Sequence, residues 1–501
     1  MPKSRTPSSR SKTARHSSKQ KQSTGTARQV ALQALRSVFA GSYADAALDR
    51  YLRQATHLGG QDRGLVTELV YGCTRQRRTL DALIDRLAKK PAHGQAPELR
   101  AVLHLGLYQI GFLTQIPNGI AVHETVELAK TSGLKGLSGL VNGLLRNYVR
   151  RREGDDAPQT GPFCFPLPEN PIEKLAIAHS YPNWIVQSWC DRLGIEAAEQ
   201  LCQWFNQVPT LDLRVNQRRG DRTTVLAALK ETGAEAEVID NLPQGIRVRK
   251  LGQSASSGRK IMELPGFKEG WWTVQDASAQ LVTLLLDPQP GEIVVDACAA
   301  PGGKTAHIAD LMSDDGCIIA LDRTLSRLKK LRQNVQRLQL DSVRSLAIDA
   351  CTWQDYATVT EDYPDELLEI FPDGLPKQCD RLLLDVPCSG LGTLHRRADA
   401  RWRQTPDNIA EIVQLQRQIL NATESWVKPG GTLVYATCTI NPPENLGLIN
   451  TFLTDHPQWA IAPPDPESIP AQFANPDGTL EVWPHLYQMD GFFMVKLLKQ
   501  P

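Results

Sequence analysis

The 501-residue chain has no apolar run long enough to cross a bilayer, which takes about 20 residues. Its N-terminus lacks the apolar core of a secretory signal. None of its ten cysteines is spaced as C-x-x-C or stands near a histidine at zinc-binding spacing. These absences argue against a membrane protein, a disulfide scaffold and a metal site. We therefore expect a cytoplasmic protein that binds neither membrane nor metal and whose thiols are mostly small buried hydrophobic groups.

Acidic residues are scarce in the first part of the chain. Residues 1–152 hold 25 Lys and Arg against 9 Asp and Glu, whereas residues 153–501 hold 31 against 46, so the net charge of +1 hides two opposite parts. A basic surface attracts phosphate, and the asymmetry indicates a nucleic-acid partner. A well-solvated basic domain would give the same count. The arginines at 150–152 suit a helix C-terminus and would also contact phosphate.

Residues 1–25 contain seven basic residues, no acidic residue and almost nothing apolar. Such a segment cannot bury a core, so we expect a disordered basic tail. Its Arg and Ser content also fits an organellar transit peptide, but it shows no clear amphipathic face. A phosphate-binding arm or a neutral tail is therefore favoured.

The length predicts about two to four domains, and residues 26–152 form the first of them. Leu32, Leu35 and Phe39 recur on one helical face. Pro97 opens a further apolar segment, in the way that proline opens a helix. The range therefore predicts an all-α domain.

Residues 153–265 combine a linker, two helices and a small α/β module. The linker, at 153–171, is rich in proline and glycine. Arginines crowd the α/β module, which predicts either a solvated surface or a unit that guides RNA. Its apolar patterns predict strands and one helix at 210–216, 221–233 (the helix), 234–240 and 245–251.

Residues 266–501 alternate short β-rich runs with helical segments. This order predicts a Rossmann-like α/β domain: a parallel sheet with helices on both faces, which binds ligands at the carboxyl ends of its strands. An acidic stretch at 354–377 interrupts the pattern and looks like a surface insertion. The β-rich runs lie at 292–298, 317–323, 344–349, 381–387 and 431–439.

The turn after the first of these strands reads Cys-Ala-Ala-Pro-Gly-Gly-Lys-Thr, from Cys298 to Thr305. Small residues between a strand and a helix let a ligand approach the backbone amides and the positive helix end. The turn is not a phosphate loop, because Cys298 stands where that loop requires glycine. Asp322 ends the next strand, where an acid holds the ribose hydroxyls of a nucleoside cofactor, and Asp349 is placed to receive an adenine amino group. Each aspartate taken alone would equally suit a helix cap.

Two cysteines follow the last two strands of the series. Cys388 stands in Asp-Val-Pro-Cys-Ser-Gly and Cys438 in Ala-Thr-Cys-Thr-Ile-Asn-Pro. Since parallel strands end at one edge of a sheet, both thiols should line the same crevice. Most cysteines in such a core serve packing, but two thiols at strand ends beside Pro, Ser and Thr suit covalent catalysis. Asp385, three residues before Cys388, is placed to contact the substrate.

These motifs resemble those of the Sun (Fmu) family of RNA cytosine-C5 methyltransferases. Residues 26–152 resemble the NusB-type helical RNA-binding domain of the bacterial ribosomal members, and residues 200–260 resemble their small middle domain. The resemblance covers all of the chain except the tail. The motifs occur in family order and spacing as DACAAPGGKT (296–305), DVPCSG (385–390), ATCTINPPEN (436–445) and DGFF (490–493).

The resemblance implies S-adenosyl-L-methionine as cofactor and a role for each motif. Cys438 would be the nucleophile and Cys388 would assist release of the product. DNA cytosine methyltransferases use the Pro-Cys thiol instead, which here would be Cys388. The residues that would hold the cofactor are Cys298, Ala299, Ala300, Pro301, Gly302, Gly303 and Lys304, completed by Asp322, Asp349 and Asp385.

Cytosine chemistry explains why two thiols and an acid are needed. Carbon 5 is too weak a nucleophile to take a methyl group directly, but a thiolate that adds to C6 makes C5 enamine-like and reactive. A base must then remove the C5 proton so that the thiolate can leave, and Asp385 would hydrogen-bond N3 and N4 of the base.

We therefore expect a monomeric cytoplasmic enzyme that methylates 16S ribosomal RNA, either naked or in a partly assembled small subunit. Two alternatives stay open. One is a transfer-RNA methyltransferase, and the other is a NusB-type RNA-binding factor without activity, against which the intact Cys388 and Cys438 argue. The 354–377 insertion and the run at 392–402 differ from the usual family pattern, which bears on RNA contacts and not on the reaction.

Overall fold

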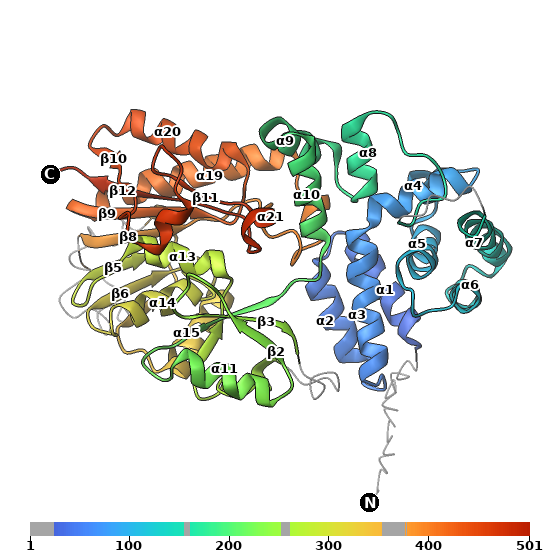
Figure 1. Cartoon of the computed structure of the whole chain (residues 1–501), viewed down its shortest axis with the longest axis horizontal. Helices are drawn as coiled ribbons and strands as arrows, with labels where there is room; N and C mark the ends of the chain where they lie inside the picture. The colour runs from blue at the N-terminus through green and yellow to red at the C-terminus, as the bar shows by residue number, and fades with distance from the viewer. Residues whose placement is uncertain (1–24, 155–160, 252–260, 353–375, 377) are drawn as a thin grey trace, which may run out of the picture.

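The computed structural model describes residues 25–154, 161–251, 261–352, 376 and 378–501. The predicted disordered tail lies outside the described residues apart from Gly25, as does nearly all of the predicted insertion at 354–377. A helical lobe, blue to teal in Figure 1, lies beside an α/β lobe that contains two sheets.

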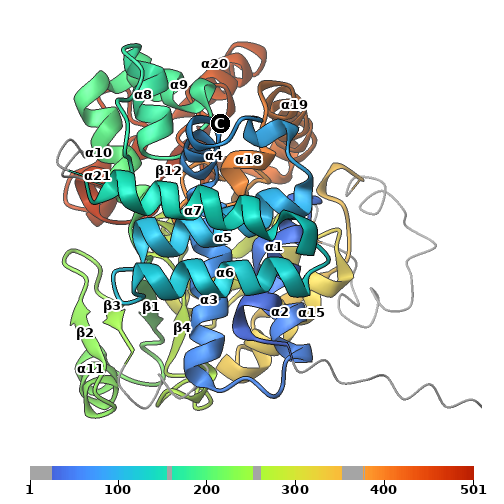
Figure 2. The ribbon, with the colours of Figure 1, turned by 90° about the vertical axis from the view of Figure 1, so that its right-hand side faces the viewer.

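The helical lobe is built around α5 (Pro97–Phe112), which begins with proline as the sequence predicts and is buried on almost all sides. The first helix, α1 (Ala27–Phe39), starts with a reciprocal cap between Thr26 and Gln29. The prediction of an all-α domain is confirmed. The other helices are α2 (Ala44–Gln54), α3 (Gly60–Arg75), α4 (Arg77–Leu87), α6 (Asn118–Thr131) and α7 (Ser138–Arg152), and Figure 2 shows α5, α6 and α7 side by side.

Three further helices connect the two lobes. Their apolar side chains pack against Leu391, Leu394 and Ile440 of the α/β lobe. They are α8 (Pro171–Ala178), α9 (Asn183–Leu193) and α10 (Ile195–Asn206).

The middle module is an antiparallel sheet in the order β2-β3-β1-β4, with α11 (Arg222–Glu231) packed on it. Its first three strands are those that the sequence predicts. The fourth strand lies past the predicted domain boundary at residue 265. It belongs to this module, because its Trp272 is fully buried in the core of this sheet. The strands are β1 (Leu211–Val215), β2 (Glu235–Val238), β3 (Gly245–Lys250) and β4 (Trp272–Val274).

The large sheet has the order β10-β12-β9-β8-β5-β6-β7, with β11 paired to β12. Its five predicted strands run parallel: β5 (Ile293–Asp296), β6 (Cys317–Leu321), β7 (Val343–Leu346), β8 (Cys379–Asp385) and β9 (Val427–Thr437). Antiparallel pairing is added by β10 (Trp459–Ile461), β11 (Leu480–Val482) and β12 (Phe492–Lys499).

The sheet is therefore mixed, where the sequence predicts a wholly parallel one. A parallel pair needs a long crossover, usually a helix. From residue 462 to 491 the only helical segments are short turns, such as α21 (Pro484–Tyr487), and the last strands pair antiparallel instead.

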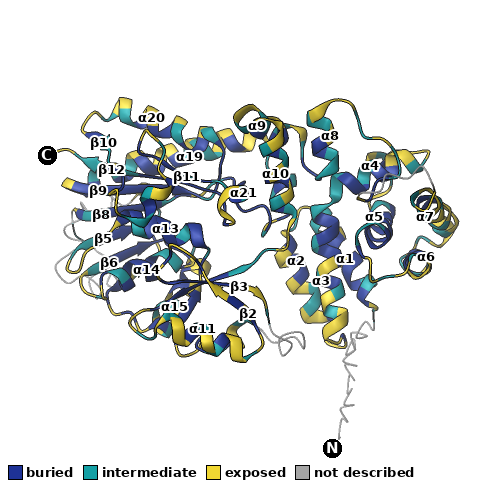
Figure 3. Ribbon diagram, in the orientation of Figure 1, coloured by how far each residue is buried: buried dark blue, intermediate teal, exposed yellow. Residues whose placement is uncertain are grey.

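Helices cover both faces of this sheet, as predicted. Alternate residues of β8 point to the two faces, so that Leu383 packs on one side and Leu382 and Leu384 on the other. Figure 3 shows the buried strands between the two helical layers. One layer is α13 (Ala277–Leu286), α14 (Gly303–Leu311) and α15 (Leu325–Leu338), and the other is α19 (Pro406–Thr423) and α20 (Leu446–Asp455). Among the described helices, none is long and apolar enough to cross a membrane.

Candidate active site

The turn between β5 and α14 carries the first motif. Gly302 has a φ of +99°, and a Cβ added there would lie 2.8 Å from the Leu331 side chain, so glycine fits where other residues would not. The Ala299 amide donates to the carbonyl of Leu321 on β6 at 2.8 Å. These contacts hold the turn against the neighbouring strand end and leave the N-terminus of α14 facing the carboxyl edge of the sheet.

A pocket opens beside this turn. Cys298, Asp322 and Asp349, three of the residues predicted to hold the cofactor, line it. Carboxylates among apolar side chains, at the carboxyl ends of parallel strands, suit a nucleoside. The remaining lining residues, to which the sequence analysis gives no cofactor role, are Ala297, Arg323, Arg327, Ala350, Pro387, Leu415 and Ile419.

The two pocket aspartates also bond their own turns. Asp322 Oδ1 accepts from the Thr324 amide at 2.8 Å, and its Oδ2 lies 3.1 Å from Arg327 Nη1. Asp349 Oδ1 accepts from the Cys351 amide at 3.0 Å. The capping interpretation therefore describes real contacts, while both side chains also face the pocket.

The other predicted cofactor residues lie in the turn or beyond the pocket. Ala299 to Gly303 form the turn itself, and Arg327 donates to the carbonyl of Ala300. Lys304 Nζ donates to Asp385 Oδ2 at 2.7 Å and lies 5.2 Å from the centre of the Phe492 ring. Lys304 and Asp385 thus form an ion pair between the pocket and the cysteines.

The structure brings the two predicted cysteines together. They follow the adjacent parallel strands β8 and β9, and the Sγ atoms of Cys388 and Cys438 lie 3.1 Å apart. Both side chains are half-buried. This contact lowers the pKa of Cys438 and raises the pKa of Cys388. Lys304 and Arg397 lower the pKa of Cys438 further, against burial and the charge of Asp385.

Close backbone approaches fix the loop that carries Cys438. The Gly392 amide donates to the carbonyl of Cys438 at 3.0 Å, and the Gly491 amide donates to the carbonyl of Gly392 at 2.7 Å. A Cβ on Gly392 would collide with the Gly491 carbonyl. The DGFF motif is therefore part of the site because its glycine touches the loop after Cys388.

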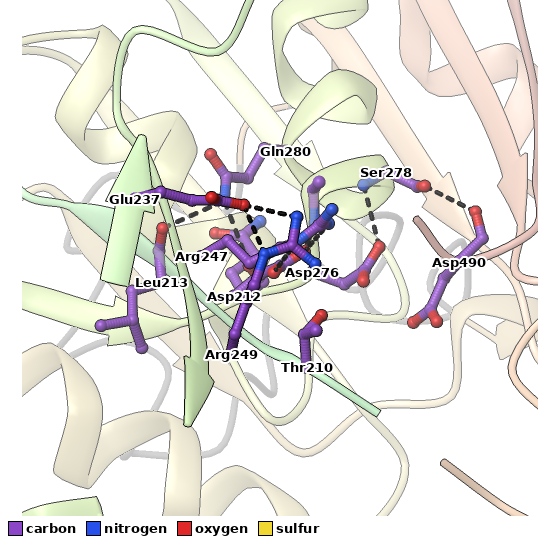
Figure 4. A network of polar contacts seen from close by, with 12 residues as sticks. Thr210, Asp212, Leu213, Glu237, Arg247, Arg249, Asp276, Ser278, Gln280 and Asp490 are labelled. Carbon is purple, nitrogen blue, oxygen red and sulfur yellow. Dashed lines mark hydrogen bonds and ion pairs between the residues drawn. The ribbon is translucent and has the colours of Figure 1, made fainter. Parts of the chain in front are cut away.

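A network of charged side chains lies next to this contact and joins the middle module to the catalytic lobe (Figure 4). Arg396 donates to Asp276 at 2.8 Å and to Asp490 at 3.1 Å. Arg247 on β3 donates twice to Asp212 on β1, at 2.8 Å each. The sequence motifs include Asp490 but give it no role, because its partners are distant in the chain.

Other cysteines serve packing. Cys73, Cys202 and Cys379 are buried in apolar cores. In the part of the chain that the structure describes, no group of His, Cys, Asp and Glu is arranged to hold a metal ion.

Three family matches divide the chain. Residues 283–498 match the family described as 16S rRNA methyltransferase RsmB/F, residues 25–150 match the NusB family, and residues 181–253 match the ferredoxin-like domain of RsmF/B-like methyltransferases. A probable ribosomal RNA small subunit methyltransferase B from Synechocystis sp. is 45% identical over 477 residues, 94% of this chain and 99% of that protein. The chain belongs to the RsmB/F family.

Further relatives extend over the same length. A probable ribosomal RNA small subunit methyltransferase B from Bacillus subtilis is 35% identical and covers 94% of this chain and 98% of its own. The crystal structure of PH0851 has a TM-score of 0.73 at 26% identity, and the match covers 94% of this chain and 98% of that one. The predicted family and its three-part fold are confirmed. As an RsmB/F member, the chain is a ribosomal RNA methyltransferase of the S-adenosylmethionine-dependent type.

Proposed function

We propose that this RsmB/F member methylates carbon 5 of a cytosine in 16S ribosomal RNA, with Cys438 as covalent nucleophile and S-adenosyl-L-methionine as methyl donor. The observation that carries the proposal is the pair of half-buried thiols, Cys388 and Cys438, 3.1 Å apart. The pair adjoins Pro387, which lines the pocket beside the turn between β5 and α14. In a covalent route, one thiol adds to the base and a second thiol assists release of the product, so the route uses both residues of this pair.

The reaction needs a thiolate, a base and a methyl donor. The Cys438 thiolate forms a bond to C6, and the electron pair of the C5–C6 double bond makes C5 nucleophilic. When bound, S-adenosyl-L-methionine would supply an electrophilic methyl group to C5, and the electron pair of the broken carbon–sulfur bond would stay on the departing thioether. A base then accepts the C5 proton, the electrons of the C5–H bond restore the C5–C6 double bond, and the Cys438 thiolate leaves with the electron pair of its bond to C6.

The surroundings favour Cys438 as the residue that attacks. Its contact with Cys388 and the positive charges of Lys304 and Arg397 lower its pKa, so the thiolate forms there first. Cys388 carries the proton of the pair and is assigned to product release. Asp385 is assigned to N3 and N4 of the cytosine, and its ion pair with Lys304 orients its carboxylate.

The pocket supports the assignment of the cofactor residues. The turn from Cys298 to Lys304 would cradle the methionine end near the α14 N-terminus. Asp322 would bind the ribose hydroxyls and Asp349 the adenine amino group, because both line the pocket.

The substrate and setting follow from the family and the charge distribution. We assign RNA binding to the basic helical domain at 26–152, RNA guidance to the module at 153–265 and catalysis to 266–501, with 1–25 as a basic tail. The substrate is 16S ribosomal RNA, naked or in a partly assembled small subunit, and the enzyme acts as a cytoplasmic monomer.

One denaturing gel tests the chemistry. Labelled RNA and cofactor are mixed with Cys388→Ala, Cys438→Ala and the double variant. Cys388→Ala should accumulate a protein–RNA complex that survives denaturation, because addition occurs but release is slow. Cys438→Ala and the double variant should trap nothing, since release cannot stall before addition.

Cys190 is also a half-buried thiol, on α9, and Cys190→Ala is therefore the matched control. This variant should methylate RNA without accumulating a protein–RNA complex. Trapping by Cys438→Ala alone would reverse the two roles. Normal turnover by Cys388→Ala would return Cys388 to a packing role.

A further inference from the structure

Glu444 is fully buried although it is a carboxylate. It ends the short helical turn Pro442–Glu444, six residues after Cys438. Its Oε2 accepts from the Ser389 amide at 2.8 Å and from Gln416 Nε2 at 3.3 Å. Its Oε1 accepts from Ser389 Oγ at 2.5 Å and from Asn441 Nδ2 at 3.1 Å. A buried carboxylate is costly unless such donors satisfy it, so the arrangement points to a use.

Two of the donor residues, Ser389 and Asn441, lie in the loops that carry the two thiols, and the third, Gln416, lies on α19. Ser389 directly follows Cys388, and its Oγ also lies 2.9 Å from the Oγ1 of Thr439, which directly follows Cys438. Glu444 therefore bonds the Cys388 loop at both the backbone and the side chain of Ser389, and it bonds Asn441 in its own loop, the one that follows Cys438. The Ser389 hydroxyl adds a direct contact between the two loops.

The next residue, Asn445, secures the second loop. Its Oδ1 accepts from Thr437 Oγ1 at 2.7 Å and its Nδ2 donates to the carbonyl of Thr439 at 3.0 Å. Thr437 and Thr439 flank Cys438. Glu444 and Asn445 thus hold the two cysteine loops in one register, which fixes the contact between the sulfur atoms.

The charge of Glu444 also distinguishes the thiols. The contact with Cys438 and burial raise the pKa of Cys388, and the negative charge of Glu444 adds to this. Cys438 instead faces Lys304 and Arg397, which lower its pKa, and Asp385, which raises it. A negative charge beside Cys388 favours the proton on that sulfur.

We propose that Glu444 is a positioning residue that gives the two cysteines different roles, by locking their loops together and keeping the proton on Cys388 so that Cys438 is the reactive sulfur. Its consequence for methyl transfer rests on the proposed covalent function. The division of reactivity between the thiols does not, and it is measurable without RNA or cofactor.

The test is thiol alkylation in the full-length Glu444→Gln variant. Iodoacetamide is applied for short times from about pH 6 to about pH 10, around the ordinary range of cysteine, and peptide mass spectrometry gives the initial rate at each cysteine. In the parent protein Cys438 should react before Cys388. In Glu444→Gln the Cys388 rate relative to Cys438 should rise about tenfold and its pH profile should move about one unit lower.

Two variants accompany this measurement. Glu424→Gln is the matched control, because Glu424 is also largely buried and accepts from Trp459 Nε1 at 2.9 Å, away from the thiols; it should leave both profiles unchanged. Ser389→Ala removes the hydroxyl link and keeps the Ser389 amide, so it should raise the Cys388 rate by a smaller factor.

An unchanged Cys388 profile in a folded Glu444→Gln variant would overturn the proposal. If that variant does not melt cooperatively, Ser389→Ala decides, and an unchanged rate ratio there would overturn the proposal as well. If Cys438 reacts before Cys388 in the parent protein but Cys388→Ala traps no RNA, the covalent function is contradicted. The alkylation result for Glu444→Gln then decides the Glu444 assignment without reference to that function.

Discussion

The indole N–H of Trp402 donates to the backbone carbonyl of Thr74 at 2.7 Å, which ties the catalytic domain to the helical domain. Trp402 lies 14 residues after Cys388, on the short helix α18 (Ala400–Arg403). Its neighbour Arg403 stacks on Tyr43 at 3.9 Å from the ring centre. The end of the run at 392–402 thus contributes to an interface within the chain.

Trp402→Phe should weaken this interface. The ring still packs, but the Thr74 carbonyl loses its donor, which costs roughly 0.5–1.5 kcal/mol. We expect faster amide hydrogen exchange at the C-terminal turn of α3 and at residues 392–403 together. Trp459→Phe removes a comparable indole bond, to Glu424, outside the interface and should leave those amides unchanged. Equal exchange in the two variants would contradict the coupling.

Local sequence patterns predict most of this architecture, because strand and helix periods and small-residue turns act over a few residues. They predict Cys298, Asp322 and Asp349 at the strand ends, and the structure has all three in the lining of one pocket. They do not reveal that Glu444 bonds Ser389, because that contact depends on how β8 and β9 sit side by side.

The sequence analysis does not predict the antiparallel strand β12, for the same reason. Its residues read as an apolar run, and strand direction is set by pairing with β9 rather than by composition. Arg327 lines the pocket only because α15 packs beside the turn, so no motif marks it.

Asp322→Asn should mainly weaken the cofactor. The amide keeps an acceptor for the Thr324 amide but loses the negative charge that would bind the ribose hydroxyls, which costs roughly 1.5–3 kcal/mol, or about 10–150-fold in affinity. Titration calorimetry with S-adenosyl-L-methionine measures this. Asp314→Asn is the control, because Asp314 caps the Ser342 amide away from the pocket. Unchanged affinity in Asp322→Asn would leave capping as the function of Asp322.

Asp296 should make stability fall as pH rises. Burial raises its pKa to about 7 from the ordinary 3.8, and Oδ1 has no partner among the described residues. The folded protein therefore favours the protonated acid. The stability from this group is full below the ordinary pKa of 3.8 and is lost as pH rises through about 7.

Asp296→Asn should remove that slope. Its free energy of unfolding relative to the parent should increase between about pH 5 and about pH 8, by at most about 1.4 kcal/mol per unit. Urea unfolding at both pH values measures it. Asp314→Asn is the control and should not show this increase. Burial raises the pKa of Asp314, but hydrogen bonds from Ser342 and neighbouring amides outweigh it and lower the pKa, so the stability from Asp314 is lost as pH falls. A constant difference for Asp296→Asn would refute the raised pKa.

The exposed arginines of α7 should supply phosphate contacts. Arg146, Arg150 and Arg151 are exposed, and their hydrogen bonds go to the neutral side chains of Asn142 and Asn147. Each arginine that binds a phosphate releases counterions, so it steepens the fall of affinity with salt.

Neutralising these three arginines together to glutamine should weaken RNA binding at low salt and flatten the plot of log affinity against log salt, by up to about 0.7–0.9 in slope per arginine. Filter binding of a ribosomal RNA fragment over a salt series gives both quantities. Arg36 and Arg53 of the same domain are exposed but contact Glu98 and Asp49, so their double glutamine variant should change the slope less per residue. If the α7 variant keeps the parental affinity and slope, the basic charge of this helix serves solvation alone and the RNA path must cross another face of the helical domain.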